Sequence, residues 1–215
     1  MLDHQKGYDV LIQGTCRRPR GFTLVEIMVT MALFVVLLGL GVPAFMTFIL
    51  NAKVKNAAET SLAGINLARA EAVSRNTVVR FQMVTNLTSS CANSSTALGW
   101  VVSLDSPAGA CEIAPSATTT PRIVQKQAGT EGTDSISVAA TSGSGVAFNG
   151  LGRIITGTTL PVPFTQIDFT SAQGVCEHAA ADGTVRCLRI LLSTGGQAKL
   201  CDPKVAATTD PRYCS

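Results

Sequence analysis

The sequence predicts an α+β protein in which a long N-terminal helix packs against a C-terminal antiparallel β-sheet. Residues 27–52 contain no Lys, Arg, Asp or Glu, and apolar residues then recur at helical spacing up to about Arg75. From Thr77 onward, short runs rich in Val, Ile and Phe are separated by Gly, Ser, Thr and Pro, which is typical of strands and turns. A chain of 215 residues has room for one or two domains.

Residues 1–21 precede the apolar run and are basic, with four Lys and Arg residues against two Asp residues. Arg17, Arg18 and Arg20 immediately precede it, and basic residues before a membrane helix favour a cytoplasmic N-terminus. A secretory signal peptide would carry its apolar stretch before the cleavage site, whereas here the stretch comes later. Without residues 1–21, 13 basic and 12 acidic residues remain and the formal charge falls from +3 to +1. A nearly neutral chain argues against broad attraction to nucleic acid.

The apolar run over residues 22–50 is long enough to be a membrane anchor. About 20 apolar residues at ~1.5 Å each cross a hydrocarbon core of ~30 Å. Glu26 lies in the first turn of this run, where a membrane helix should least tolerate a carboxylate. The acidic residue therefore requires an explanation.

The residues around this carboxylate carry a family resemblance. The segment Gly21-Phe22-Thr23-Leu24-Val25-Glu26 resembles the prepilin peptidase site of type IV pilins and type II secretion pseudopilins. In that family, cleavage follows the glycine and the new N-terminal phenylalanine is N-methylated. The resemblance implies that Gly21 ends a leader of residues 1–21, that Phe22 is the methylated first mature residue, and that Glu26 is the fifth.

Glu26 has two roles that do not exclude each other. An ionised carboxylate in lipid needs a partner, and the amino group of Phe22 from a neighbouring subunit would supply one when helices stack in parallel. Such a pair would fix the axial register between subunits. Alternatively, the carboxylate favours its own helix N-terminus and stays at the membrane interface. The second arrangement suits a stored monomer and the first suits a filament.

The predicted helix runs from Phe22 to about Arg75 in two parts. Residues 22–50 form the membrane and filament-core part, where Pro43 predicts a kink or local melting near residues 39–43; loss of helix there on assembly is implied by the resemblance. Residues 51–76 form the amphipathic spine of a head at residues 77–215. The apolar stripe of this spine consists of Val54, Ala58, Leu62, Ile65, Ala68 and Ala72.

Eight strands are predicted after the helix. They are Thr77–Met83, Gly99–Leu104, Arg122–Lys126, Ser135–Ala139, Val146–Phe148, Gln166–Thr170, Arg186–Ser193 and Gln197–Cys201. The last two flank Gly195-Gly196, a hairpin signal. Loops 84–98, 105–121 and 171–185 are rich in small polar residues and are expected to be exposed and to determine partner specificity.

The order of these elements narrows the resemblance to one subgroup. A long helix is followed by a strand, a Gly-Trp-Val-Val strand at residues 99–102, a Val-Ala-Phe-Asn-Gly-Leu-Gly-Arg segment at residues 146–153, and a closing Arg-Ile-Leu-Leu-Ser-x-Gly-Gly hairpin at residues 189–196. This order resembles the FimT/FimU–GspH group of minor pilins and the minor pseudopilin H. The resemblance covers residues 15–214.

Cysteine usage agrees with an exported head. Removal of the leader takes one of the seven cysteines and leaves six, an even set that indicates disulfides with 15 pairings open. Proximity in the sequence favours Cys91–Cys111, Cys176–Cys187 and Cys201–Cys214. The last pair is the most strongly expected because it would hold an otherwise free tail.

The residues do not predict a catalytic site. We find no nucleophile with a matched base and no phosphate-binding glycine loop after a strand. Cys176, His178 and Cys187 have the chemistry of zinc ligands, but a disulfide is the simpler expectation outside the cytoplasm. Trp100 is expected in the core or as an anchor on the head surface. We therefore expect no enzyme activity, no metal and no cofactor.

DNA binding is a separate question, since some FimT-like pilins bind DNA through a Gly-Arg-x-Arg motif near the C-terminus. The matching place here is Gly196-Gln197-Ala198-Lys199, in which the first arginine is replaced by Gln and the second by Lys. Lys199, Lys204 and Arg212, with Arg186 and Arg189, would form a small basic patch giving weak, salt-sensitive binding. A solvated C-terminal face is the favoured interpretation.

Taken together, the residues and the resemblance predict a minor pilin of the priming or tip complex of a type IV pilus. Its expected location is the bacterial inner membrane as a single-pass protein with a periplasmic head, and later the filament. The expected partners are prepilin peptidase, other minor pilins and the major pilin, the inner-membrane assembly platform and membrane lipid. The alternatives are a minor pseudopilin H of type II secretion and a DNA-binding pilin for transformation.

Overall fold

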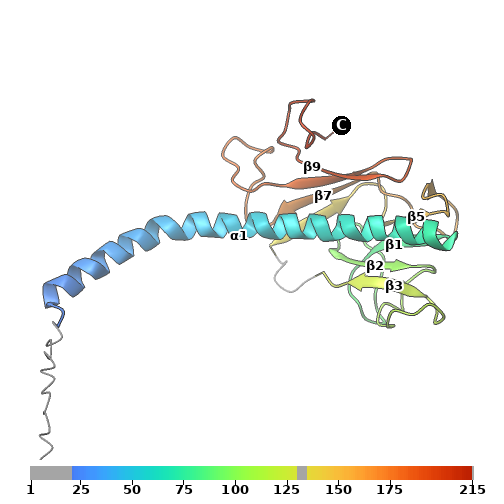
Figure 1. The fold of residues 1–215 in the computed structure, drawn as a ribbon, viewed down its shortest axis with the longest axis horizontal. Coiled ribbons are helices and arrows are strands. Elements are labelled where there is room, and N and C mark those ends of the chain that lie inside the picture. Colours follow the sequence, from blue (N-terminus) through green and yellow to red (C-terminus); the bar gives the residue numbers. More distant parts are fainter. Residues whose placement is uncertain (1–20, 130–134, 215) are drawn as a thin grey trace, which may run out of the picture. The chain divides into compact units, whose positions relative to one another are not determined.

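The computed structural model describes residues 21–129 and 135–214, and the side chains within them except those of residues 40–44. The described residues form one helix and nine strands (Figure 1). The chain divides into two units, residues 1–43 and 44–215, and each is considered by itself. Of the predicted leader, residues 1–20 lie outside the described residues, as does the side chain of Pro43.

Helix α1 spans Leu24–Arg75. It begins two residues later than predicted because Thr23 caps it: the Thr23 hydroxyl accepts a hydrogen bond of 3.2 Å from the backbone N–H of Glu26. It ends at the predicted residue, and the following Asn76 has a φ of 47°, the left-handed conformation that terminates many helices.

The first unit contains the apolar part of α1 up to residue 43. Every side chain of residues 21–39 is exposed. Apolar side chains that none of the described residues covers are expected to be buried against lipid or another chain. Among the helices that the structure describes, none is long and apolar enough to cross a membrane.

The head in the second unit contains two antiparallel sheets rather than the single predicted one. The first has five strands in the order β3-β2-β1-β5-β6. Their bounds are β1 Val79–Val84, β2 Gly99–Ser103, β3 Ile123–Gln127, β5 Gly145–Phe148 and β6 Ile154–Ile155. The second has four strands in the order β4-β7-β8-β9, with bounds β4 Ile136–Ala140, β7 Gln166–Ser171, β8 Leu188–Leu192 and β9 Ala198–Cys201. In Figure 1, β7 and β9 lie above the head part of α1 and β1 to β3 below it.

The eight predicted strands are all present, with ends that differ by at most two residues. The predicted hairpin is also present, since β8 and β9 pair antiparallel with Leu192 opposite Ala198. Strand β6 has only two residues, which is too short to leave a periodic signal. The division into two sheets depends on β4 pairing with β7, and local alternation of residues contains no information about such a distant partner.

The head part of α1 is joined to both sheets by one hydrophobic core. Five of the six predicted stripe residues are fully buried there, and Leu62 packs at its edge. The ring of Phe81 on β1 packs against Trp100 on β2, with ring centroids 5.7 Å apart. Trp100 is only 3% exposed, so of its two expected positions it takes the one in the core.

The helix approaches these two rings through Gly64. A Cβ atom added there would lie 2.9 Å from a ring carbon of Phe81 and 3.0 Å from one of Trp100. Both distances are shorter than ordinary van der Waals contact. Because Gly64 has no side chain, the helix can lie this close to the five-stranded sheet.

A second, smaller cluster buries the opposite face of the five-stranded sheet. Val84, Val101 and Ile123 from β1 to β3 pack there with Cys91 and Cys111. The two loops expected to be exposed, 84–98 and 105–121, therefore also cover the sheet. The loop after Cys111 is fixed by the ammonium of Lys126 on β3, which donates to the backbone carbonyls of residues 111, 112 and 113 at 2.7, 2.9 and 3.0 Å.

Candidate functional site

The predicted cleavage site lies immediately before the first helical turn. Residues 21–23 are not helical, and Phe22 is 78% exposed. The bond between Gly21 and Phe22 therefore lies in open backbone, which a peptidase can bind in extended form without unwinding a helix. Because Thr23 caps α1, removal of the residues before Phe22 would leave the helix start intact.

Glu26 lies in the first turn of α1, and its side chain is exposed. It forms no ion pair with any of the residues that the structure describes. A carboxylate in the first turn is favoured by the positive end of the helix dipole, which corresponds to the interface arrangement. The pairing with an amino group of another subunit stays a prediction.

The segment before Pro43 is helical in the single chain. Helix α1 is unbroken from Leu24 to Arg75, so the local melting predicted for residues 39–43 is not found in this state. Loss of helix on assembly stays a prediction, because only an assembled filament would test it.

The six cysteines that follow the apolar part of α1 form three disulfides. They join Cys91 to Cys111, Cys176 to Cys187 and Cys201 to Cys214, with Cα–Cα distances of 6.1, 5.5 and 5.2 Å. These are the pairs that proximity in the sequence favours. The sulfurs of Cys176 and Cys187 are therefore oxidised and are not thiolate ligands, and the three residues weighed as a zinc site do not form one in this state.

Removal of the Cys201–Cys214 disulfide is expected to release the tail. In the double variant Cys201→Ser, Cys214→Ser, the tail keeps only noncovalent contacts, which open and close. Among them are the hydrogen bonds from the Asp202 N–H to the Arg212 carbonyl (2.8 Å) and from Lys199 to the Tyr213 carbonyl (2.9 Å), and the ion pair of Lys204 with Glu177 (2.6 Å). Loss of a cross-link that closes a loop of this length costs about 3 kcal/mol of stability. Limited proteolysis should cut residues 203–213 first, and a tail as resistant as in the parent would contradict this expectation.

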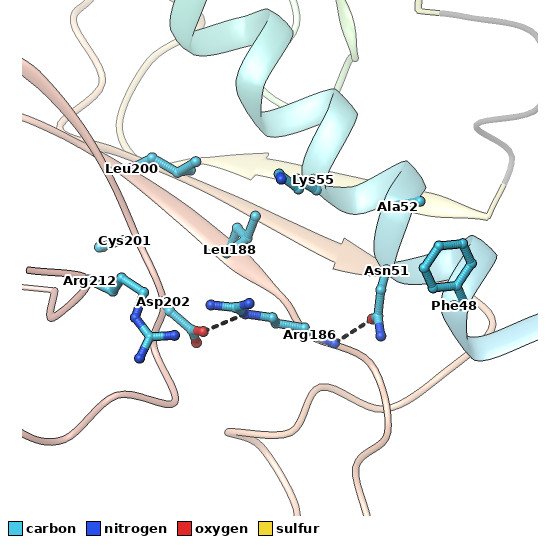
Figure 2. A pocket seen from close by; sticks show the side chains of 10 residues that line it. All are labelled: Phe48, Asn51, Ala52, Lys55, Arg186, Leu188, Leu200, Cys201, Asp202 and Arg212. Atoms are coloured by element: carbon cyan, nitrogen blue, oxygen red, sulfur yellow. Dashed lines mark hydrogen bonds and ion pairs between the residues drawn. The ribbon is translucent and has the colours of Figure 1, made fainter. Parts of the chain in front are cut away.

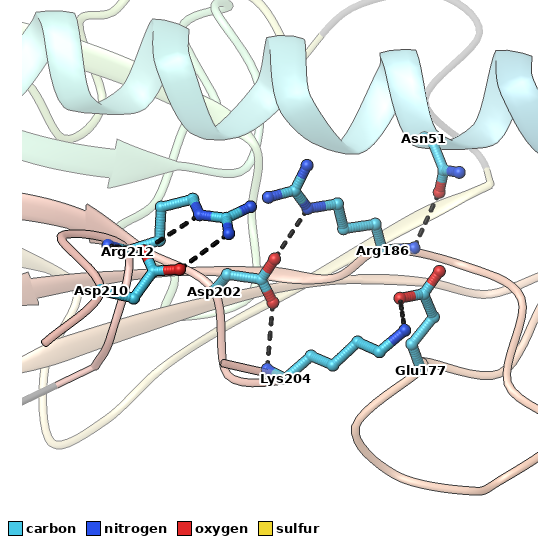
Figure 3. Close-up of polar contacts among 7 residues, drawn as sticks. All are labelled: Asn51, Glu177, Arg186, Asp202, Lys204, Asp210 and Arg212. Atoms are coloured by element: carbon cyan, nitrogen blue, oxygen red, sulfur yellow. Dashed lines mark hydrogen bonds and ion pairs between the residues drawn. The ribbon is translucent and has the colours of Figure 1, made fainter. Parts of the chain in front are cut away.

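The cations proposed for DNA contact each have a partner. Arg186, Arg189, Lys204 and Arg212 form ion pairs with Asp202, Asp168, Glu177 and Asp210 at 2.6–2.8 Å. Figure 3 shows three of these pairs side by side near the start of the head. Lys199 donates instead to a backbone carbonyl. A phosphate would have to share each of these cations with its carboxylate partner, and DNA contact stays a prediction.

One of these carboxylates, Asp202, connects three parts of the head. It is 4% exposed and accepts hydrogen bonds from Arg186 Nε (2.7 Å) and the Lys204 N–H (3.0 Å). The Arg186 N–H in turn donates to Asn51 Oδ1 of α1 at 2.8 Å. Asp202 was missed by sequence reasoning. The only local signal is its place between the end of a strand and a proline.

Asp210 has a pKa lowered to about 2 by the hydrogen bonds from the Arg212 side chain and backbone, with a smaller contribution from the charge of Arg186. A depressed pKa means that this pair stabilises the fold above pH 3.8, and that the contribution disappears as the pH falls from about 4 to about 2. We expect the pKa of Asp210 in an Arg212→Gln variant to return toward 3.8, as measured by NMR titration of the carboxyl carbon. An unchanged pKa would contradict the assigned cause.

A cleft of about 540 Å³ opens beside this cluster, between α1 and the β8–β9 side of the second sheet (Figure 2). Apolar and cationic side chains share its lining. The residues are Phe48, Asn51, Ala52, Lys55, Arg186, Leu188, Leu200, Cys201, Asp202 and Arg212. Its volume lies in the range of ligand pockets. The sequence did not predict it, because its walls come from segments about 150 residues apart.

Comparison with known proteins gives two family matches. Residues 57–201 match the family described as type II transport protein GspH. Residues 16–42 match the prokaryotic N-terminal methylation motif. No curated protein matches the sequence.

Two solved structures are similar to the chain, both of the type IV minor pilin FimU from Pseudomonas aeruginosa in different crystal forms. One shares 15% identity, with a TM-score of 0.44 over 73% of this chain and 94% of that one. The other shares 17% identity, with a TM-score of 0.42 over 72% and 97%.

Proposed function

The chain belongs to the GspH family, whose model matches residues 57–201. Because it belongs to this family, we propose that it is a minor pilin of the complex that primes or caps a type IV pilus. The observation that carries the proposal is the N-terminal methylation motif at residues 16–42. That motif includes the start of a helix whose apolar side chains, up to residue 39, are not covered by any of the described residues.

The proposed role is structural. After removal of residues 1–21, the apolar part of α1 would pass from the inner membrane, where it serves as a single-pass anchor, into the filament core. Burial of apolar surface at roughly 25 cal/mol per Å² would supply most of the assembly free energy, while Glu26 would set the register. The disulfide-bonded head would remain outside the membrane, in the periplasm. The proposed partners are prepilin peptidase, the other minor pilins, the major pilin and the inner-membrane assembly platform.

Mass spectrometry of the chain purified from cells tests the processing step. We expect a mature N-terminus at Phe22 with one added methyl group, and a longer, unmethylated chain in cells that lack prepilin peptidase. A Gly21→Val variant should stay unprocessed, whereas Gly39→Val, in the same apolar region, should be processed normally. Recovery of the intact leader on the mature protein in cells with an active peptidase would refute the proposal.

A second candidate is a minor pseudopilin of type II secretion, favoured by the description of the matching family as a type II transport protein. Deletion of the gene separates the two. Loss of surface pili with normal secretion of exoproteins supports the pilus role, and the reverse outcome supports the secretion role.

A further inference from the structure

The cleft beside Asp202 combines an apolar wall with cations on opposite sides. Phe48 of α1 and Leu188 and Leu200 of the sheet form the wall. Phe48, near the end of the apolar part of α1, is 68% exposed, so none of the described residues covers this large aromatic ring at the mouth. An exposed ring of this size beside a cavity is a typical anchor point for a partner side chain.

The charges of the lining are unequal in number and in exposure. Three cations, Lys55, Arg186 and Arg212, accompany one carboxylate, Asp202. The Asp202 side chain is 6% exposed, whereas those of Arg186 and Arg212 are 45% and 57% exposed. Glu59 and Asp210, the ion-pair partners of Lys55 and Arg212, lie outside the lining, so the exposed charges of the lining itself are mainly positive.

The two arginines are also held in fixed orientations. Arg186 binds Asp202 through Nε, and Arg212 binds Asp210 through Nε and Nη2. Lys55 is contributed by α1 on the opposite wall and forms an ion pair with Glu59 at 3.7 Å. A guanidinium that is already oriented loses less entropy when it binds a carboxylate.

We propose that this cleft binds an acidic segment of a partner protein, in which an apolar side chain lies between two carboxylates. The apolar side chain packs on Phe48 and Leu188, one carboxylate faces Lys55 and the other faces the two arginines. An anionic lipid fits less well, because its negative charge lies on a single head group. The three cations are separated, since they come from α1, from the segment before β8 and from the tail.

A blocked, fluorescently labelled peptide with one phenylalanine between two glutamates tests the proposal. It is titrated against the full processed chain in nanodiscs of zwitterionic lipid, and fluorescence anisotropy is measured at low and high salt. We expect saturable binding that weakens with salt, and at least about fivefold weaker binding of the peptide with glutamines in place of the glutamates. No binding of the glutamate peptide, or equal binding of both peptides, would overturn the proposal.

Matched variants locate the binding. Lys55→Gln and Arg212→Gln should each weaken it about two- to fivefold, and Phe48→Ser about tenfold. Lys53→Gln and Phe45→Ser are the controls, because both side chains are on α1 but not in the lining, and they should leave the affinity unchanged. Equal losses in the controls would overturn the proposal.

Soluble dihexanoyl phosphatidylglycerol tests the alternative of a lipid. If it binds the cleft while the glutamate peptide does not, the site is a lipid site and the proposal is wrong. Binding by the cleft does not require filament membership. If the chain from cells with an active peptidase keeps its leader and still binds the peptide, the proposed function is contradicted and the binding proposal is not.

Discussion

Replacement of Gly64 with valine is expected to destabilise the head by about 3 kcal/mol. The added Cβ would lie within 3.1 Å of the rings of Phe81 and Trp100, and two more methyl groups would follow it. Neither ring can move aside easily, since both are buried and packed against each other. The helix would have to shift away from the sheet or the core would have to open, because close-packed interiors do not absorb extra volume.

Thermal unfolding of the full chain in detergent measures this effect. At 2–4 °C per kcal/mol for a domain of this size, the midpoint should fall by roughly 6–12 °C. Ala70→Val, at an exposed position of the same helix, serves as the control, because it changes helix propensity without entering the core. Similar midpoints for the two variants would show that Gly64 does not limit the helix–sheet distance.

Replacement of Glu26 with alanine is expected to reduce incorporation into filaments at least about tenfold while leaving membrane insertion intact. In an assembled apolar core, the amino group of Phe22 would lose its partner, and an unpaired buried charge costs roughly 3–5 kcal/mol. Insertion should not suffer, because removal of a carboxylate makes the segment more apolar.

The fraction of the chain in sheared filaments, relative to the membrane fraction, measures the effect. Glu59→Ala is the matched control, since it removes an exposed carboxylate that pairs with Lys55 in the head part of the same helix. Normal incorporation of the Glu26 variant would refute the pairing role.

Local patterns predicted the local features of the fold. The end of α1 at Arg75 follows from helical periodicity, and the β8–β9 hairpin follows from Gly195-Gly196 between two apolar runs. The three disulfides join neighbours in the sequence, so proximity was sufficient to select them. The strand ends were predicted to within two residues because Gly, Ser and Pro bound the runs.

The larger features that sequence reasoning missed depend on distant pairing. The separation of the strands into two sheets rests on β4 meeting β7, and the cleft rests on α1 meeting the segments around Arg186 and Asp202. The basic residues of the tail were predicted as a patch, but their acidic partners lie 2 to 27 positions away. A charge count cannot show which cations are neutralised. Only the folded arrangement does.

The cysteine pairs follow one another along the chain without crossing: each loop closes before the next begins. A polypeptide that emerges from its N-terminal side would therefore expose each cysteine together with its native partner before any competing thiol arrives. Oxidation in that order needs no reshuffling by an isomerase, and the head should mature in a host that has only a simple thiol oxidase.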